Sequence, residues 1–117
     1  MAQDIDWPEF IKTLNRRGMK LREGNPDVMA AFRALDQAAS KDGALDSKTK
    51  ELMCMAIGIA IRCDGCLAYH AKAAIKYGAT REEVLDMIGV AVYMGGGPSN
   101  IYGAEALDAF DSLLAAS

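Results

Sequence analysis

The chain has 117 residues, of which 51% are hydrophobic and 25% are charged, and its formal net charge is −3. This balance is typical of one folded domain, which we place at residues 1–117, and it argues against disorder. It also argues against a nucleic-acid-binding protein, because no basic stripe is present and the aromatic residues are too scattered to stack on bases.

Helical periodicity dominates the chain, and no segment alternates convincingly with the period of a strand. The first amphipathic pattern runs from Trp7 to about Leu21. Asn25 and Pro26 then suit the cap and the first turn of a second helix. The later helices are predicted at residues 26 to about 43, 47 to about 62, about 65 to 78, 81 to 95 and 99 to 115. Asp46 or Ser47 could cap the third helix, and Thr80 to Glu83 form a capping box. We therefore expect an all-α bundle of five or six helices.

Two of the predicted helices, at residues 52–61 and 84–94, are apolar on nearly every face. A helix that is apolar all round must be buried all round, and a chain this short has difficulty enclosing two of them. The two helices could pack on each other at the centre of one subunit. We favour self-association, which would bury the remaining apolar surface.

The segment from Cys63 to His70 carries the strongest functional signal. Its two thiols are three residues apart, and the only histidine follows the second thiol by four residues. Cys63, Cys66 and His70 share one face if the segment is helical. Cys66, one turn from His70, is the better placed to give up a proton, whereas Asp64 opposes a second negative charge beside the pair. The pattern indicates a redox-active dithiol.

Two other interpretations of these residues stay open. The cysteines and the histidine could be buried core residues. Cys54, Cys63, Cys66 and His70 also supply the four nitrogen and sulfur ligands of a structural zinc site, although Cys54 belongs to the preceding helix and a second, more distant ligand pair is missing. We interpret Cys54 as a core residue because it falls inside an apolar run, and we expect neither a metal nor an organic cofactor.

A resemblance to a known family extends this picture. The string Glu51…Cys63-x-x-Cys66-x-x-x-His70, with twelve residues from Glu51 to Cys63, resembles the signature of the carboxymuconolactone decarboxylase superfamily. It is closest to the branch of alkylhydroperoxidase D (AhpD). The turn at residues 78–83 and the glycine stop at residues 95–98 are similar to that family as well, so the resemblance covers residues 45–112. It implies an AhpD-like helical subunit that assembles into trimers or hexamers.

The resemblance also implies roles for the four signature residues. It implies that Cys66 attacks a peroxide, that Cys63 resolves the product, and that His70 and Glu51 relay protons, with Glu51 polarising His70. Taken alone, Glu51 could equally be an exposed carboxylate in the first turn of a helix. The chain departs from the family pattern at Gly65, where a second histidine usually precedes the second cysteine. One proton-handling group is therefore missing.

The sequence predicts an AhpD-like oxidoreductase, a CxxC-dependent thiol peroxidase or disulfide reductase that cycles through a Cys63–Cys66 disulfide. Its expected partners are a hydroperoxide, an external dithiol or lipoyl-type reductant and further copies of the chain. The alternative is a carboxymuconolactone decarboxylase-like lyase in which the dithiol is incidental.

A cytoplasmic location is expected, with no contact with a membrane. The first residues lack the basic and apolar regions of a signal peptide. The longest apolar run, residues 52–61, is shorter than the roughly 20 residues that cross a bilayer. Cysteines of a cytosolic protein are more often reactive than paired for stability.

Overall fold

The structure, a computed structural model, describes residues 4–117, and within them it contains helices and no strand. The six helices are α1 (Trp7–Gly24), α2 (Pro26–Ser40), α3 (Ser47–Ile61), α4 (Asp64–Lys76), α5 (Arg81–Gly95) and α6 (Gly97–Ala116). The all-α prediction is confirmed. Residues 1–3, which belong to the N-terminal segment compared above with a signal peptide, lie outside the described residues.

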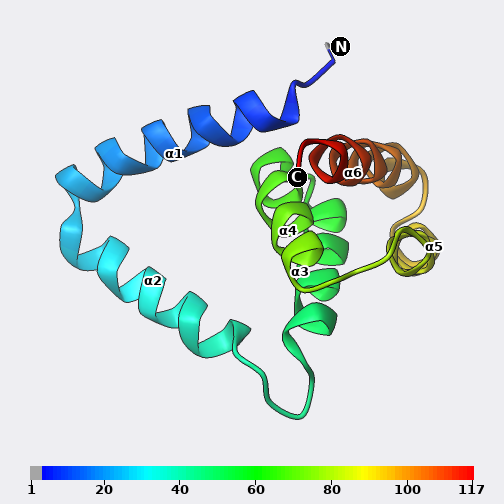
Figure 1. The fold of residues 1–117 in the computed structure, drawn as a ribbon, viewed down its shortest axis with the longest axis horizontal. Coiled ribbons are helices and arrows are strands. Elements are labelled where there is room, and N and C mark those ends of the chain that lie inside the picture. The colour runs from blue at the N-terminus through cyan, green and yellow to red at the C-terminus, as the bar shows by residue number, and fades with distance from the viewer. Residues whose placement is uncertain (1–3) are drawn as a thin grey trace.

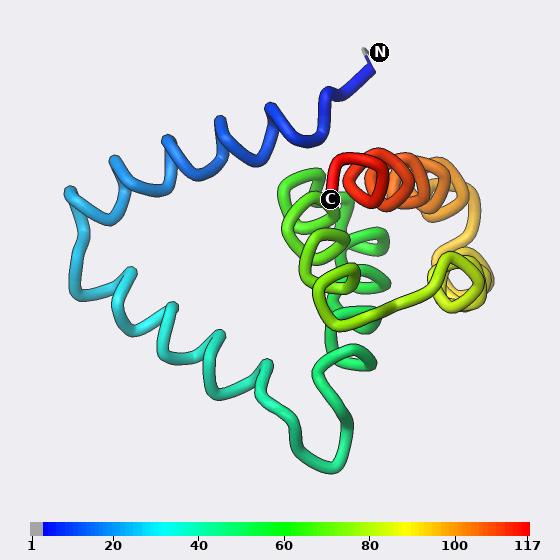
Figure 2. Tube along the Cα trace, in the orientation of Figure 1, coloured from blue at the N-terminus to red at the C-terminus, as the bar shows by residue number. Residues whose placement is uncertain are grey.

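The helices form a bundle and an arm. α3, α4, α5 and α6 pack on one another, and α1 and α2 form a V that stands off from them (Figure 1). Figure 2 follows the same path along the trace, from the N-terminal arm into the bundle. α1 packs on α4 and α6, whereas among the described helices α2 contacts α1 and α3. The arm is therefore fixed to the bundle at its two ends.

Trp7 holds the start of α1 to the bundle. Its side chain is 1% exposed, and its indole Nε1–H donates a hydrogen bond to Asp108 of α6 at 2.9 Å. The Trp7 ring also meets the ring of Phe10 edge to face. The largest side chains buried with it come from α3, α4, α5 and α6: Met55, Ile59, Leu67, Val84 and Phe110.

Most helix ends follow the predicted signals, but α4 ends at Lys76 rather than Gly78 and α6 begins at Gly97 rather than about Ser99. Asp46, not Ser47, caps α3 and accepts a hydrogen bond from the Thr49 amide at 2.8 Å, and the capping box that opens α5 is present. α1 continues to Gly24, beyond the predicted end, because no strong helix breaker precedes the Asn25–Pro26 pair. Asn25 occupies the cap position of α2 but makes no side-chain cap hydrogen bond. α2 ends at Ser40, before Gly43.

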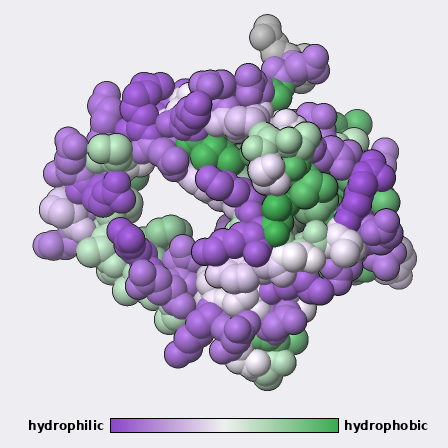
Figure 3. Space-filling view, in the orientation of Figure 1, coloured by the Kyte–Doolittle hydropathy of each residue, from purple (hydrophilic) through white to green (hydrophobic). Residues whose placement is uncertain are grey.

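Much apolar surface stays exposed in one chain. α2 contributes no buried residue, and its Phe32 and Leu35 are each 63% exposed. The two apolar helices are buried on one side only, since α3 exposes Ile57 and Ile61 and α5 exposes Val90, Tyr93 and Met94. Figure 3 shows an opening between the arm and the bundle. None of the helices in the described part of the chain combines the length and hydrophobicity needed to cross a bilayer.

Replacing Trp7 with alanine should detach the arm. The substitution removes a fully buried aromatic side chain, so we expect the free energy of unfolding to fall by about 3–5 kcal/mol. Urea titration followed by circular dichroism measures the loss. Trp7→Phe keeps most of the buried ring and serves as the control. Equal losses for the two variants would contradict an anchoring role for the buried ring.

Candidate functional site

The turn between α3 and α4 creates the centre of the site. The chain leaves α3 through Arg62 in the left-handed conformation, with φ of 60°, and the Cys63 amide donates to the Gly58 carbonyl oxygen at 3.0 Å. Cys63 then becomes the N-cap of α4, and its Sγ accepts a hydrogen bond from the Cys66 amide at 3.2 Å. Cys63 and Cys66 are joined by a disulfide, with their Cα atoms 5.2 Å apart. The dithiol thus lies at the amide-rich start of a helix, which favours thiolates.

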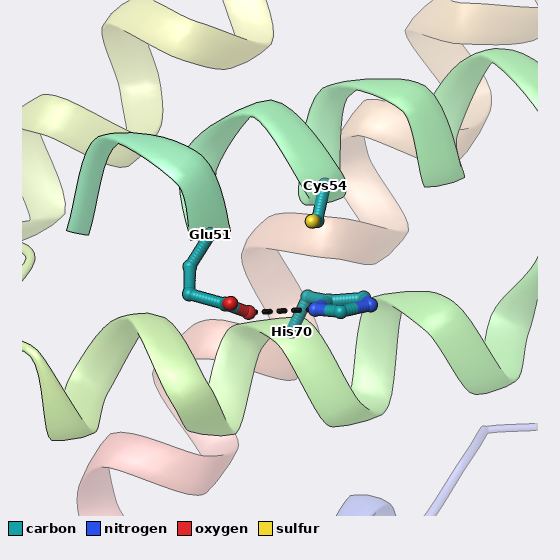
Figure 4. A group of neighbouring side chains, drawn as sticks. All are labelled: Glu51, Cys54 and His70. Atoms are coloured by element: carbon teal, nitrogen blue, oxygen red, sulfur yellow. Dashed lines mark hydrogen bonds and ion pairs between the residues drawn. The ribbon is translucent and has the colours of Figure 1, made fainter. Parts of the chain in front are cut away.

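His70 and Glu51 form a hydrogen-bonded pair across the two helices. His70 lies on α4 and Glu51 on α3, and their Nδ1 and Oε1 atoms are 2.6 Å apart (Figure 4). Glu51 is 4% exposed, so the interpretation of Glu51 as an exposed first-turn carboxylate is wrong. The fold brings together two residues that lie 19 positions apart in the sequence, on consecutive helices.

This pairing gives His70 a defined chemistry. An ionised Glu51 accepts a hydrogen from Nδ1, which leaves the lone pair of the neutral ring on Nε2. A buried carboxylate also stabilises the imidazolium that forms when Nε2 takes a proton. The pair can therefore act as a general base and return the proton afterwards.

The disulfide and this pair open into one cavity of about 1060 Å³ between α2 and the α3–α4 pair. Its polar wall includes Glu51, Cys54, Cys63, Cys66 and His70, and α2 supplies the apolar side chains of Phe32 and Leu35. The cavity thus joins a disulfide, a histidine–carboxylate pair and an apolar surface.

Cys54 belongs to this site and not to the core. It is half-buried and lines the cavity, because it lies one turn after Glu51 on the face of α3 that meets α4. Figure 4 shows Glu51 and Cys54 pointing from α3 toward His70. One donor atom from each of the three residues lies within 4.8 Å of the others. Burial raises the pKa of the Cys54 thiol, and the carboxylates of Glu51 and Asp36 raise it further.

These three residues offer an oxygen, a sulfur and a nitrogen to a metal ion. The four-ligand zinc set considered from the sequence is not available in this form of the protein, because Cys63 and Cys66 bond to each other. Glu51 and His70 are likewise already paired.

The glycine that departs from the family pattern faces α1. A Cβ added at Gly65 would lie 3.5 Å from a Leu14 methyl group, which is an ordinary van der Waals contact. Tyr69 also contacts α1, since its hydroxyl donates to Asn15 Oδ1 at 2.6 Å. α1 thus packs beside the start of α4, next to the position where the family pattern has its second histidine.

Glu105 of α6, which the sequence patterns do not single out, meets Asp64 at the start of α4. Burial raises the pKa of Glu105 to about 7, and the carboxyls of Asp64 and Asp108 add to the shift. The one signal available in the sequence was a carboxylate between alanines on a largely apolar helix. Nothing in the sequence pairs it with Asp64.

The fold and the site agree with the comparisons. Residues 26–109 match the carboxymuconolactone decarboxylase family, and the chain belongs to that family. An uncharacterized protein of Cupriavidus necator is 36% identical over 103 residues, which are 88% of this chain and 91% of that protein. Uncharacterized protein 4 in the cox locus of Paracoccus denitrificans is 36% identical over 110 residues, or 94% and 96% of the two chains.

Two solved structures are also similar. A carboxymuconolactone decarboxylase family protein from Legionella pneumophila superimposes with a TM-score of 0.90 at 48% identity, covering 92% of this chain and 96% of that one. A family protein from Thermotoga maritima, described as having a possible part in the antioxidative response, gives a TM-score of 0.79 at 30% identity. That match covers 90% of this chain and 89% of the Thermotoga chain.

Cys54 should react slowly with iodoacetamide in the oxidised protein, where it is the one thiol outside the disulfide. Its raised pKa lowers the thiolate fraction, and each pKa unit changes that fraction about tenfold. Mass spectrometry of the alkylated fraction over time gives the rate, and the same protein unfolded in urea is the reference. Asp36→Asn should accelerate the reaction. Equal rates in folded and unfolded protein would contradict the buried environment.

Proposed function

We propose that this chain is a thiol peroxidase or disulfide reductase that uses the Cys63–Cys66 pair. The observation that carries the proposal is the disulfide at the start of α4, in the same cavity as the hydrogen-bonded Glu51–His70 pair. A dithiol that closes at a helix N-terminus, beside a base, is suited to repeated oxidation and reduction. The family is enzymatic in general, and the description of the Thermotoga maritima relative points toward the same chemistry.

The proposed cycle begins with the reduced pair. His70, held by Glu51, takes the proton of the Cys66 thiol through Nε2. The Cys66 thiolate attacks the outer oxygen of a hydroperoxide, which breaks the O–O bond and forms a sulfenic acid. The departing alkoxide recovers the proton from His70 and leaves as an alcohol. The Cys63 thiol then attacks the sulfenic sulfur, so that the disulfide forms and water leaves.

The cycle closes when an external dithiol or lipoyl-type protein exchanges with the Cys63–Cys66 disulfide. The donor loses two electrons and two protons and becomes a disulfide, while the two cysteines return to thiols. This step needs a compartment in which dithiol donors are kept reduced, which supports a cytoplasmic location. The cycle needs no metal or organic cofactor.

We also propose that the chain works as a homo-oligomer of three or six copies. The exposed apolar surface supports this: the α2 face carries Phe32 and Leu35, and the α5 surface carries Val90, Tyr93 and Met94. Patches of this kind on a small domain mark contact surfaces. A second copy seated on α2 would also close the open side of the cavity, because Phe32 and Leu35 line it.

Replacing Cys66 with serine should abolish peroxide turnover, because serine cannot form the sulfenic acid. Cys63→Ser should instead stall after one event and accumulate a Cys66 sulfenic acid, which mass spectrometry detects as one added oxygen on the protein. Peroxide consumption with a dithiol donor gives the turnover. Cys54→Ser is the matched control and should retain the Cys63–Cys66 disulfide after oxidation.

The lyase alternative makes the opposite prediction. If the dithiol is incidental, alkylation of the reduced protein leaves lactone decarboxylation intact, and that result would favour the lyase. Full peroxidase activity in the Cys66→Ser protein would end the assignment of Cys66 as the attacking thiol.

Replacing Tyr93 with aspartate should weaken the oligomer and leave the subunit folded. The side chain is 85% exposed in one chain, so the change does not disturb the core, but it places a charge on the proposed contact surface. Light scattering coupled to size-exclusion chromatography measures the mass, and circular dichroism checks the helix content. Arg17→Gln, at an exposed position of α1 outside the proposed contact surfaces, serves as the control. A monomeric unaltered protein would refute the oligomer.

A further inference from the structure

Two carboxyl groups, one of them at the start of α4, lie buried without a hydrogen-bond donor. Asp64 Oδ1 and Glu105 Oε2 are each buried, with less than 1 Å² of exposed surface, and neither has a partner among the described residues. The two side chains lie within hydrogen-bonding reach of each other. Two ionised carboxylates can only accept hydrogen bonds. A hydrogen bond between them therefore requires a proton on one of the two groups, which then donates to the other.

The surroundings of the pair favour holding that proton. The charged groups that act on Glu105 are Asp64 from α4 and Asp108 from its own helix, and both are acidic. Asp108 is in turn bonded to the Trp7 indole of α1. α3 and α5 contribute apolar residues to the core, among them Met55, Ile59 and Val84. Like charges in an apolar setting do not all ionise at neutral pH.

Asp64 connects this pair to the redox centre. It is the first residue of α4 and directly follows Cys63, the N-cap. The Cys63 sulfur accepts the Cys66 amide hydrogen, a contact that stabilises a thiolate at this position. The charge on the Asp64–Glu105 pair acts in the opposite direction, since negative charge beside a thiol disfavours its ionisation.

We propose that Glu105 keeps a proton at neutral pH and shares it with Asp64 through a hydrogen bond, and that this proton makes Glu105 a positioning residue that controls how readily Cys63 ionises. With the proton in place the pair carries one negative charge, and without it two. Proton loss from the pair and ionisation of Cys63 therefore oppose each other. The role of Cys63 as the resolving thiol rests on the proposed function. The electrostatic coupling between Cys63 and the Asp64–Glu105 pair does not depend on that role.

The arrangement gives each cysteine its own proton-handling group. The Glu51–His70 pair opens into the cavity together with Cys66, and the buried Asp64–Glu105 pair includes the residue that directly follows Cys63. The shared proton keeps the thiolate of Cys63 accessible in the neutral range. Above that range the buried pair carries a second negative charge, which disfavours the Cys63 thiolate.

A titration of Cys63 alone tests the proposal. In a Cys54→Ser, Cys66→Ser background, Cys63 is the one thiol left, and its ultraviolet thiolate absorbance is followed through the neutral and alkaline range. Adding Glu105→Gln fixes the pair at one negative charge, and the glutamine amide can still donate to Asp64. We expect the thiolate fraction above neutral pH to rise about three- to tenfold, which corresponds to half a pKa unit to one unit.

Glu82→Gln in the same background is the control. It removes the same charge from an exposed position in the first turn of α5, so the Cys63 titration should not change. Superimposed titrations with and without Glu105→Gln would overturn the proposal. The titration uses no peroxide, so it tests the coupling independently of the proposed function. A protein that lacks peroxidase activity but shows this shift would support the coupling alone. An active peroxidase without the shift would support the proposed function alone.

Thermal stability gives a second readout in the otherwise unaltered chain. The pKa of Glu105 is raised above its ordinary value of 4.5 to about 7, so its proton stabilises the fold fully below that ordinary value. This stabilisation is lost as the pH rises through about 7. The melting temperature of Glu105→Gln relative to wild type should therefore increase across that range. A difference that stays constant with pH would count against the shared proton.

Discussion

The close packing of α3 against α4 is the constraint on which the rest of the structure depends. It is possible because residue 58 is glycine: a Cβ there would lie 3.3 Å from the Cβ of Cys66 and from a methyl group of Leu67. The tight contact brings Glu51 to His70 and places Cys54 beside them. The left-handed turn at Arg62 then sets Cys63 at the helix start. A wider separation of the two helices would leave the histidine without its carboxylate.

Around this contact the chain separates two electrostatic tasks. On the cavity side, a histidine and a buried carboxylate can take and return a proton. On the buried side, two acidic groups lie against the first turn of α4, where the helix amides favour negative sulfur. The opposing influences meet at Cys63, whose sulfur accepts an amide hydrogen bond and which directly precedes Asp64 of the buried pair. The two carboxyl-containing pairs therefore draw on α3, α4 and α6, since α6 supplies Glu105.

The apolar surfaces connect the fold to its proposed assembly. Small domains bury a limited share of their surface, and this chain uses two of its six helices as an arm that encloses little by itself. The inner face of α2 lines the cavity that contains the disulfide. The same surface can thus serve substrate access and subunit contact. This would explain why a helix with no buried residue keeps a regular apolar stripe.

Local signals in the sequence determined the helices and the grouping of Cys63, Cys66 and His70, because turn residues, periodicity and helical spacing act over a few residues. The family resemblance also singled out Glu51, but the residues alone left its place undecided. Only the tertiary structure paired Glu51 with His70, moved Cys54 from the predicted core into the cavity, filled the space beside Gly65 with Leu14 and joined Asp64 to Glu105. Each of these depends on which faces of separate helices meet, and that is decided by burial of the whole chain rather than by neighbouring residues.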